Sequence, residues 1–305
     1  MNDDAKMAWL AARRNGISGT DVAAICGLSK WTTALKLWAW KTGKLAEDGE
    51  ETEPMRIGKL LEPWLLARYL ERTGRTWPGH VPETCSVLTP APWLLLASKA
   101  QPWMLGSPDV FCGDRGVDFK CSSLFSEWGA EGTDEIPSAA LVQCQWYMAV
   151  TGLARWDVFA FLGGRTLRLY ELTANPELQT ALVERCRAWW QRCIVEGAAP
   201  EASAGDSPTL SALHPSPSEE MRPANLRASE LARRYAEARK EEKKYAGFAE
   251  GFAASLKAEI ASSRGLIGPD WHATWSPVKA SDYMVHKKAG RTFRVTFDHD
   301  EGDDE

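Results

Sequence analysis

Several features that would assign this protein to a simple class are missing from its sequence. No stretch of about 18 consecutive apolar residues occurs, so no membrane-spanning helix is expected. The seven cysteines contain no Cys-x-x-Cys spacing, which argues against a zinc ribbon or a disulfide framework. Of the five histidines, four lie at or beyond residue 214, so a histidine-bound metal centre is not indicated. These absences favour a reduced, cytoplasmic protein.

An excess of basic residues, which many DNA-binding proteins have, is also missing, because the formal net charge is −5. The imbalance comes from the C-terminus. Six acidic residues lie in 298–305, and without them 36 basic residues face 35 acidic ones. We expect 298–305 to be a solvated acidic tail and the rest of the chain to be nearly neutral.

Changes in composition divide the chain into segments. Residues 1–198 alternate helical patterns with short β-prone runs, which predicts an α/β domain. Residues 199–223 are rich in Ala, Ser and Pro and are expected to be a linker. The appendage at 224–297 is predicted to contain one long helix and a small β-hairpin, with strands near 271–276 and 291–297.

The predicted long helix spans 225–263. Together with residue 264 it carries nine basic and six acidic residues, while its apolar residues are sparse. Such a helix suits docking along a narrow apolar stripe, as in a coiled coil, and equally suits contact with DNA. Both roles remain open at this point.

The most informative motif is a hairpin predicted around the turn sequence Gly113–Gly116. On its second strand Asp118 and Lys120 project to one face, and Phe119 projects to the core. If the hairpin is symmetric, Asp109 faces Lys120 and lies diagonally from Asp118, with α-carbons roughly 7–8 Å apart. Two carboxylates and an ammonium group suit a divalent cation and an activated water, which indicates a metal-dependent phosphodiesterase. Charges that merely pair on an exposed strand are the alternative.

Five segments resemble, in order, the YqaJ / lambda-exonuclease-like family of phage-type recombination exonucleases; they are Trp9–Ser29, Gly58–Pro63, Ser107–Asp109, Asp118–Lys120 and Gln143–Gly152. The resemblance covers residues 9–175. It implies an α/β (α+β) fold in which 1–198 form a restriction-endonuclease-like PD-(D/E)xK nuclease core with flanking helices. Two positions depart from the family: Asp118 stands where Glu is usual, and Thr20 where Ser is usual. Each keeps the functional group.

The resemblance also implies a metal site. Mg²⁺, or Mn²⁺ in its place, would bind as a pair of ions to Asp109, Asp118, the Phe119 carbonyl and Glu62, the last directly or through water. Lys120 would hold the attacking water and stabilise charge on the phosphate. For Glu62 the alternative is an exposed helix carboxylate without a function.

Two further groups complete the predicted site. Gln143 is expected beside the metals and the attacking water, with Gln145 as the alternative, because residues two apart on a helix cannot both face one site. Arg13, Thr20 and Ser107 correspond to the family's pocket for a DNA 5′-phosphate, and a guanidinium with two hydroxyls suits that dianion. A purely structural role, in helix capping, is the alternative for Arg13 and Thr20.

The resemblance therefore predicts an enzyme, a Mg²⁺-dependent DNA exonuclease that resects duplex 5′ ends and leaves 3′ single strands for recombination. Its partners would be double-stranded DNA ends, a single-strand annealing protein and further copies of the chain, in a bacterial or phage-infected cell. An endonuclease of the same fold and a non-catalytic DNA-binding or assembly protein are the alternatives. Among 15 tryptophans, Trp31 and Trp103 are candidates for stacking on an unpaired base.

Overall fold

The computed structural model describes residues 3–46, 52–216, 221, 223–277, 293 and 295. The chain forms two compact units, Met1–Leu213 and His214–Glu305, and each is described by itself. Among the described residues, no helix has the length and apolar character that crossing a membrane requires.

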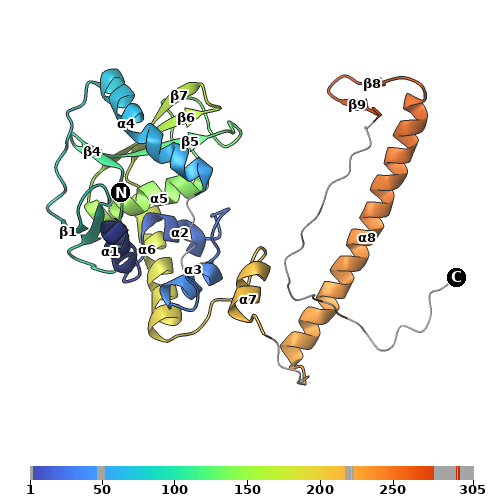
Figure 1. Cartoon of the computed structure of the whole chain (residues 1–305), viewed down its shortest axis with the longest axis horizontal. Coiled ribbons are helices and arrows are strands. Elements are labelled where there is room, and N and C mark those ends of the chain that lie inside the picture. The colour runs from blue at the N-terminus through green and yellow to red at the C-terminus, as the bar shows by residue number, and fades with distance from the viewer. Residues whose placement is uncertain are drawn as a thin grey trace. The chain divides into compact units, whose positions relative to one another are not determined.

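The first unit combines helices with two sheets in a mixed α/β fold (Figure 1). Its helical elements are α1 (Asp3–Arg13), α2 (Gly19–Ile25), α3 (Ala34–Lys41), α4 (Glu53–Thr73), α5 (Ser138–Thr151), α6 (Pro176–Trp190), the π-helical turn η1 (Gln191–Val195) and α7 (Ser207–Leu213). Its strands are β1 (Cys85–Thr89), β2 (Leu95–Ser98), β3 (Leu105–Gly106), β4 (Val110–Cys112), β5 (Arg115–Ser122), β6 (Arg155–Leu162) and β7 (Thr166–Thr173).

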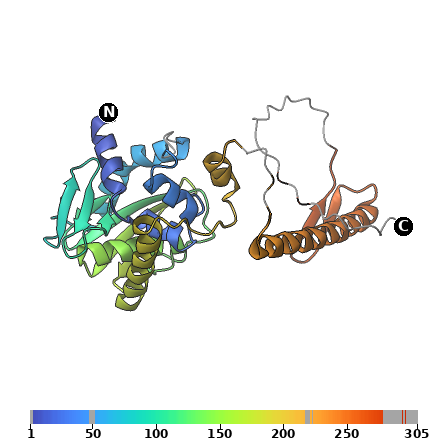
Figure 2. The ribbon, with the colours of Figure 1, turned by 90° about the horizontal axis from the view of Figure 1, so that it is seen from below.

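The larger sheet has the strand order β4-β5-β6-β7. Its outer pairs are antiparallel, whereas β5 and β6 are parallel, and α5 lies in the connection between them. A parallel pair needs such a crossover, because its second strand must start again at the same end of the sheet. The smaller sheet, β1-β2-β3, is antiparallel and lies beside α1 and α5, at the left of Figure 2.

Apolar side chains cover both faces of the larger sheet. On one face Phe119 and Phe159 pack against Leu65 and Tyr69 of α4. The main core contains Trp156, Val158, Ala160 and Tyr170 of the same sheet together with residues of α2, α5 and α6. Because successive residues of a strand project to opposite faces, Asp118 and Lys120 point away from the α4 face on which Phe119 is buried.

The predicted hairpin exists, but its register differs from the expected one. The pairs are Val110 with Val117 and Cys112 with Arg115, so the turn consists of Gly113 and Asp114 alone. Continued by one residue, this register places Asp109 opposite Asp118 and not opposite Lys120. The tight turn explains the shift, since Gly113 has a φ of 59°, a left-handed conformation that suits a two-residue hairpin loop.

Part of the segment 199–223, predicted as a linker, is packed onto the first unit. Thr33 at the start of α3 donates a hydrogen bond to Asp206, which is buried. Leu213 of α7 contacts the apolar cluster of Leu35 and Trp38. Local composition did not reveal this packing, because its partners lie about 170 residues earlier in the chain.

The second unit contains α8 (Leu226–Ile260) and the antiparallel strands β8 (Gly265–Ile267) and β9 (His272–Thr274). The long predicted helix is present as α8. The strand near 271–276 is present as β9, but it pairs with β8, which we did not predict. The second predicted strand, near 291–297, and the acidic tail at 298–305 lie almost wholly outside the described residues.

Candidate metal and phosphate site

The centre of the candidate site is an ion pair on β5. The Lys120 ammonium lies 2.9 Å from Asp118 Oδ2 and donates to Gln143 Oε1 of α5 at 3.2 Å. Burial opposes a charged lysine, but the carboxylates of Asp118 and Asp109 outweigh it and raise the pKa of Lys120. Lys120 is therefore a fixed cation at neutral pH, and two of its three protons have protein acceptors.

Asp109 lies next to this pair, just before β4. Its Oδ2 accepts a hydrogen bond of 2.7 Å from the backbone N–H of Phe119. The side chain remains exposed to solvent. Even so, the surrounding protein and the charge of Asp118 raise the pKa of Asp109 to about 8, against the opposing effect of Lys120. Two carboxylates are crowded here with too little positive charge between them.

The buried carboxylate of Asp118 has one unsatisfied oxygen. The residue is 1% exposed, and its Oδ1 has no hydrogen-bond partner. A buried acceptor without a partner costs free energy, so such an atom is expected to face a cation or a donor. In the ranges described above, no group of three or more His, Cys, Asp and Glu side chains gathers closely enough to hold a metal. A cation held by Asp118 and Asp109 alone would keep several of its waters, which is how Mg²⁺ usually binds to one or two carboxylates.

Glu62 approaches from α4 and stays exposed. The pKa of Glu62 is raised, mainly because the surrounding protein excludes water from its carboxylate. The charge of Asp118 adds to this increase, and the charges of Lys59 and Lys120 oppose it. Glu62 is thus within electrostatic reach of Lys120 and Asp118. Its place on α4 follows from the helix, since Leu65 and Tyr69, one and two turns later, are buried against the sheet.

The structure distinguishes the two glutamines of α5. Gln143 accepts from Lys120, whereas Gln145 is buried and turned toward the end of β7. There Gln145 donates to the Thr173 carbonyl at 2.8 Å and accepts from the backbone N–H of Asn175 at 2.9 Å. Gln145 therefore joins α5 to the chain after β7, and only Gln143 lies at the candidate site.

A residue that sequence reasoning missed, Tyr147, fixes Gln143 from behind. Gln143 Nε2 donates to the Tyr147 hydroxyl at 3.1 Å, which in turn donates to the Ser107 carbonyl at 3.2 Å. Gly19 at the start of α2 lies against both side chains. A Cβ on Gly19 would come within 2.8 Å of Gln143 Cγ and 2.6 Å of Tyr147 Cε1. The beginning of α2 thus adjoins the Lys120 site directly.

Arg13 and Thr20, two of the residues predicted to bind a phosphate, are in direct contact. The Arg13 guanidinium donates to the hydroxyls of Ser18 and Thr20, each at 3.1 Å, and pairs with Asp21 at 3.2 Å. Asp21 is buried and also pairs with Lys41 at 3.0 Å. Burial raises the pKa of Asp21, but Lys41 and Arg13 outweigh burial and lower it. Asp21, Ser18 and Lys41 were not predicted as part of this cluster. The charges of Asp21 and Lys41 become informative only once the two residues are known to be buried.

Of the other residues predicted to contact DNA, Ser107 and Trp103 have contacts within the protein, and Trp31 does not pack against the core. The Ser107 hydroxyl donates to the Leu94 carbonyl, which is not part of the Arg13 cluster. Trp103 is half-buried against Trp146, with ring centroids 5.8 Å apart, which indicates a packing role. Trp31 is 87% exposed and remains available for stacking.

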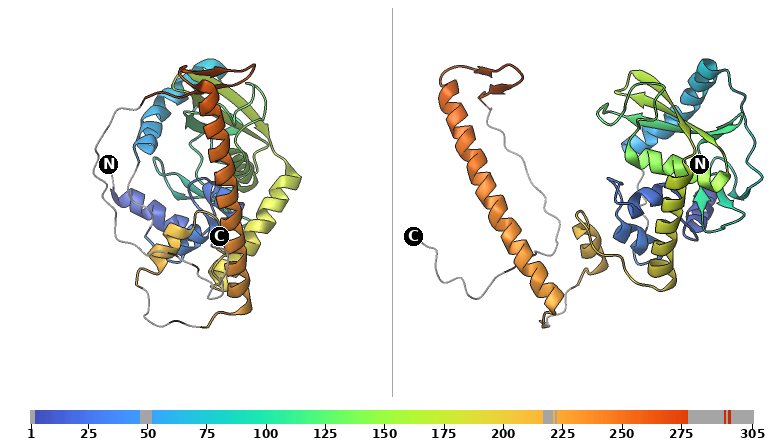
Figure 3. Two further views of the ribbon diagram at one scale, coloured as in Figure 1. Left: turned by 90° about the vertical axis from the view of Figure 1, so that its right-hand side faces the viewer. Right: turned by 180° about the vertical axis from the view of Figure 1, so that it is seen from behind.

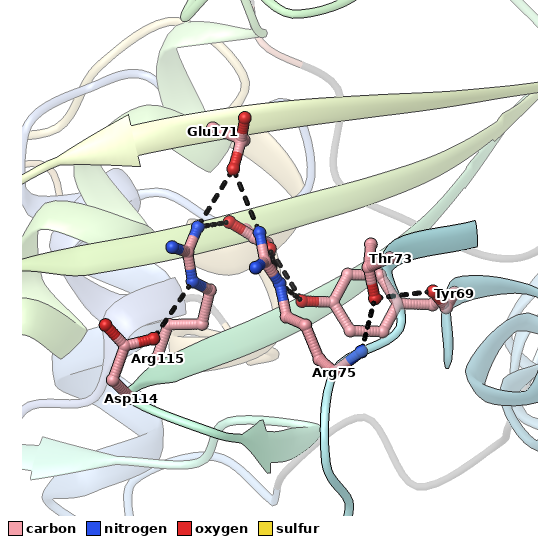
Figure 4. Close-up of polar contacts among 7 residues, drawn as sticks. Tyr69, Thr73, Arg75, Asp114, Arg115 and Glu171 are labelled. Atoms are coloured by element: carbon pink, nitrogen blue, oxygen red, sulfur yellow. Dashed lines mark hydrogen bonds and ion pairs between the residues drawn. The ribbon is translucent and has the colours of Figure 1, made fainter. Parts of the chain in front are cut away.

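A second polar cluster, also missed, lies on the α4 face of the sheet. Figure 4 shows Glu171 accepting from both Arg75 and Arg115. Beneath it Asp157 is fully buried and accepts from Arg115 at 2.7 Å, Arg75 at 3.1 Å and the Tyr69 hydroxyl at 2.6 Å. This cluster joins β5, β6 and β7 to the C-terminal end of α4. Glu62 lies in the N-terminal half of the same helix.

Comparison with known proteins agrees with the motifs. Residues 8–154 match the YqaJ-like viral recombinase domain. The predicted relationship to the YqaJ family is confirmed. This YqaJ-like segment contains every predicted site residue, from Arg13 to Gln143. The uncharacterized protein YqaJ of Bacillus subtilis strain 168 is 29% identical over 196 residues, which span 63% of this chain and 57% of that protein.

Solved structures show more distant likenesses. One is the alkaline exonuclease LHK-Exo from Laribacter hongkongensis in complex with dAMP, with 18% identity, a TM-score of 0.47, and coverage of 62% of this chain and 92% of that one. Another is a phage related exonuclease from Haemophilus somnus 129PT, with 13% identity, a TM-score of 0.40, and coverage of 60% and 96%. The mixed α/β fold described above rests on the chain's own helices and strands.

Proposed function

We propose that this chain is a Mg²⁺-dependent deoxyribonuclease with a PD-(D/E)xK core. It would resect duplex DNA from 5′ ends and leave 3′ single strands for phage-type recombination. The observation that carries the proposal is the buried Asp118 carboxylate, whose Oδ1 has no partner, beside the Lys120 cation and the exposed Asp109. The relationship of residues 8–154 to YqaJ-like recombinases supports the same activity.

The proposed ligands are Asp118, Asp109, the Phe119 carbonyl and, through water, Glu62. The Phe119 N–H points to Asp109. Since the N–H and C=O of one strand residue point to the same side, the Phe119 carbonyl faces that side as well. Mg²⁺ or Mn²⁺, as a pair of ions, would supply charge that lowers the pKa of a water and stabilises the leaving oxygen.

Lys120 and Gln143 have positioning roles in this proposal. The pairing of Lys120 with Asp118 and Gln143 leaves one ammonium proton for a water or a phosphate oxygen. Because its pKa is raised, Lys120 keeps its charge and stabilises negative charge that develops on the phosphate. Gln143, held by Tyr147, fixes the direction of the ammonium group.

Arg13 and Thr20 would bind the terminal 5′-phosphate, with Ser107 nearby. The contact of Gly19 with Gln143 supports this role, because it places the start of α2 next to the cleavage site. A phosphate dianion would take the place of Asp21 as an acceptor for Arg13, while Lys41 retains Asp21. Such a clamp turns a hydrolytic centre into one that prefers DNA ends.

The proposed partners are duplex DNA ends, a single-strand annealing protein and further copies of the chain, in the cytoplasm of a bacterial or phage-infected cell. An endonuclease of the same fold and a non-catalytic DNA-binding or assembly protein are the alternatives. The partnerless Asp118 oxygen favours catalysis over the last of these, since a degenerate site has no need to keep a buried carboxylate oxygen without a hydrogen-bond partner.

The test is digestion of end-labelled linear duplexes, with and without a 5′-phosphate, compared with a closed circle in Mg²⁺. Asp118→Asn should lower cleavage on the order of 100- to 1000-fold. Asp114→Asn, in the turn of the same hairpin, is the matched control and should keep full activity. An active Asp118→Asn protein would refute the site. Cutting of the circle would identify an endonuclease, and binding without cutting would identify a non-catalytic protein.

A further inference from the structure

α8 presents a regular stripe of exposed apolar side chains. Figure 3 shows α8 as one unbroken helix with the β8–β9 hairpin at its C-terminal end. The residues of this stripe are spaced alternately four and three positions apart, which is the spacing of a coiled-coil seam. They are Leu231, Tyr235, Ala238, Glu242, Tyr245, Ala249, Phe252 and Leu256, and we call them the seam. Only Glu242 is charged, and all eight are exposed. Phe293 contacts the Tyr235 ring from the same chain and leaves 40% of Tyr235 exposed.

The order of residue sizes along this seam is nearly the same from either end. Leucine comes first, then a large aromatic residue, then alanine, and the centre is Glu242 followed by Tyr245. We propose that α8 pairs with α8 of a second copy of this chain as an antiparallel coiled coil centred between residues 243 and 244. This surface and its partner are independent of the proposed nuclease activity.

In this arrangement every layer matches in size. Leu231 meets Leu256 of the partner subunit, and Tyr235 meets Phe252 of the partner subunit. Ala238 meets Ala249 of the partner subunit, so the helices approach closely on either side of the centre. At the centre Glu242 meets Tyr245 of the partner subunit, whose hydroxyl can donate to the carboxylate. Large residues meet large ones and small residues meet small ones, so the seam is complementary.

Charge disfavours the parallel alternative. In a parallel pair Glu242 would lie against Glu242 of the partner subunit inside the seam. The positions that flank the seam would also bring Arg234 near Arg239 of the partner subunit. Both contacts are between like charges and disfavour that orientation. The antiparallel pair has neither conflict, which also explains why the seam tolerates a glutamate at its centre.

Seven charged residues of α8 form ion pairs along the helix itself. Glu230 contacts Arg233 and Arg234, Arg239 contacts Glu242, and Glu241 contacts Lys244. Such pairs at spacings of three and four residues stabilise a helix and reduce the net field available to a polyanion. This favours assembly over DNA contact for α8, two roles that the sequence leaves equally open.

The length of the seam sets the strength of the pairing. From Leu231 to Leu256 the seam is roughly 38 Å long, at 1.5 Å per residue. That is between three and four heptads, close to the shortest length that supports a coiled coil. We therefore expect a dimer that dissociates on dilution.

Sedimentation velocity of the full chain over a range of concentrations tests the proposal. The wild-type protein should shift from monomer to dimer, and Leu231→Lys with Leu256→Lys should remove the shift. Leu226→Lys is the control, since Leu226 is 92% exposed on α8 but lies outside the seam. Circular dichroism checks that each variant keeps its helix.

A charge-swap variant tests the orientation. Leu231→Lys with Leu256→Glu places opposite charges together only in the antiparallel pair, so it should dimerise at low salt and dissociate at high salt. A parallel pair would keep lysine against lysine and stay apart. A monomeric wild-type protein at every concentration, or an assembly that the double lysine variant leaves intact, overturns the proposal. Failure of the charge-swap variant to pair overturns the antiparallel arrangement.

Discussion

Asp157→Asn is a sensitive test of the structure because it changes one buried charge and almost no volume. Asp157 is 0% exposed and accepts from Arg115, Arg75 and Tyr69. The amide retains one acceptor oxygen but removes the negative charge. Arg115, with a side chain only 6% exposed, would then depend on Asp114 and Glu171, whose side chains are exposed to water.

The expected magnitude follows from that burial. Breaking a buried ion pair by changing one partner costs about 3–5 kcal/mol, because the remaining charge stays in the interior without compensation. The first unit, Met1–Leu213, is a large domain, and for that size 1 kcal/mol corresponds to roughly 2–4 °C in melting temperature. We therefore expect the transition of this unit to fall by roughly 6–20 °C.

Glu171→Gln is the matched control. Glu171 contacts the same two arginines, but its side chain is 52% exposed, so its loss should cost about 1 kcal/mol or less. Thermal unfolding followed by tryptophan fluorescence gives both values, because Trp156 lies in the core next to Asp157 on β6. Equal losses in the two variants, or a loss below about 1 kcal/mol for Asp157→Asn, would show that the buried network does not anchor α4 to the sheet.

Two further predictions concern the candidate site. Gly19→Ala should push Gln143 away from Lys120, because the new Cβ overlaps Gln143 Cγ. We expect DNA cleavage to fall and the free energy of unfolding to decrease by about 1–3 kcal/mol. The control is Gly247→Ala, which has open space around it and should leave cleavage unchanged. Arg13→Ala should reduce the preference for 5′-phosphorylated over 5′-hydroxyl ends in single-turnover digestion, and Arg14→Ala, its exposed neighbour, should not. An equal loss on both ends would make Arg13 a structural partner of Asp21.

Much of the local organisation follows from the sequence. The long helix α8 occurs where its pattern predicts it, and the hairpin of β4 and β5 forms around the predicted turn. The tight turn at Gly113 was recognised, yet the pairing across it was wrong by two residues. Turn sequences with several glycines allow more than one loop length, and the choice depends on how the strands pack afterwards.

The sequence by itself determined that Asp118 and Lys120 share a strand face, because alternation along a strand is a local property. It also showed the order of motifs that relates residues 8–154 to YqaJ-like proteins. Helical periodicity separated Gln143 from Gln145 but did not tell which one faces the site.

Only the tertiary structure decided the remaining features. It turned Gln143 toward Lys120, brought Gly19 of α2 against α5, and buried Asp21 and Asp157 with their basic partners. Each of these depends on contacts between residues far apart in the chain. A charged residue gives the same local signal whether it is solvated or buried, and its energetic role is decided by the partners that folding places around it.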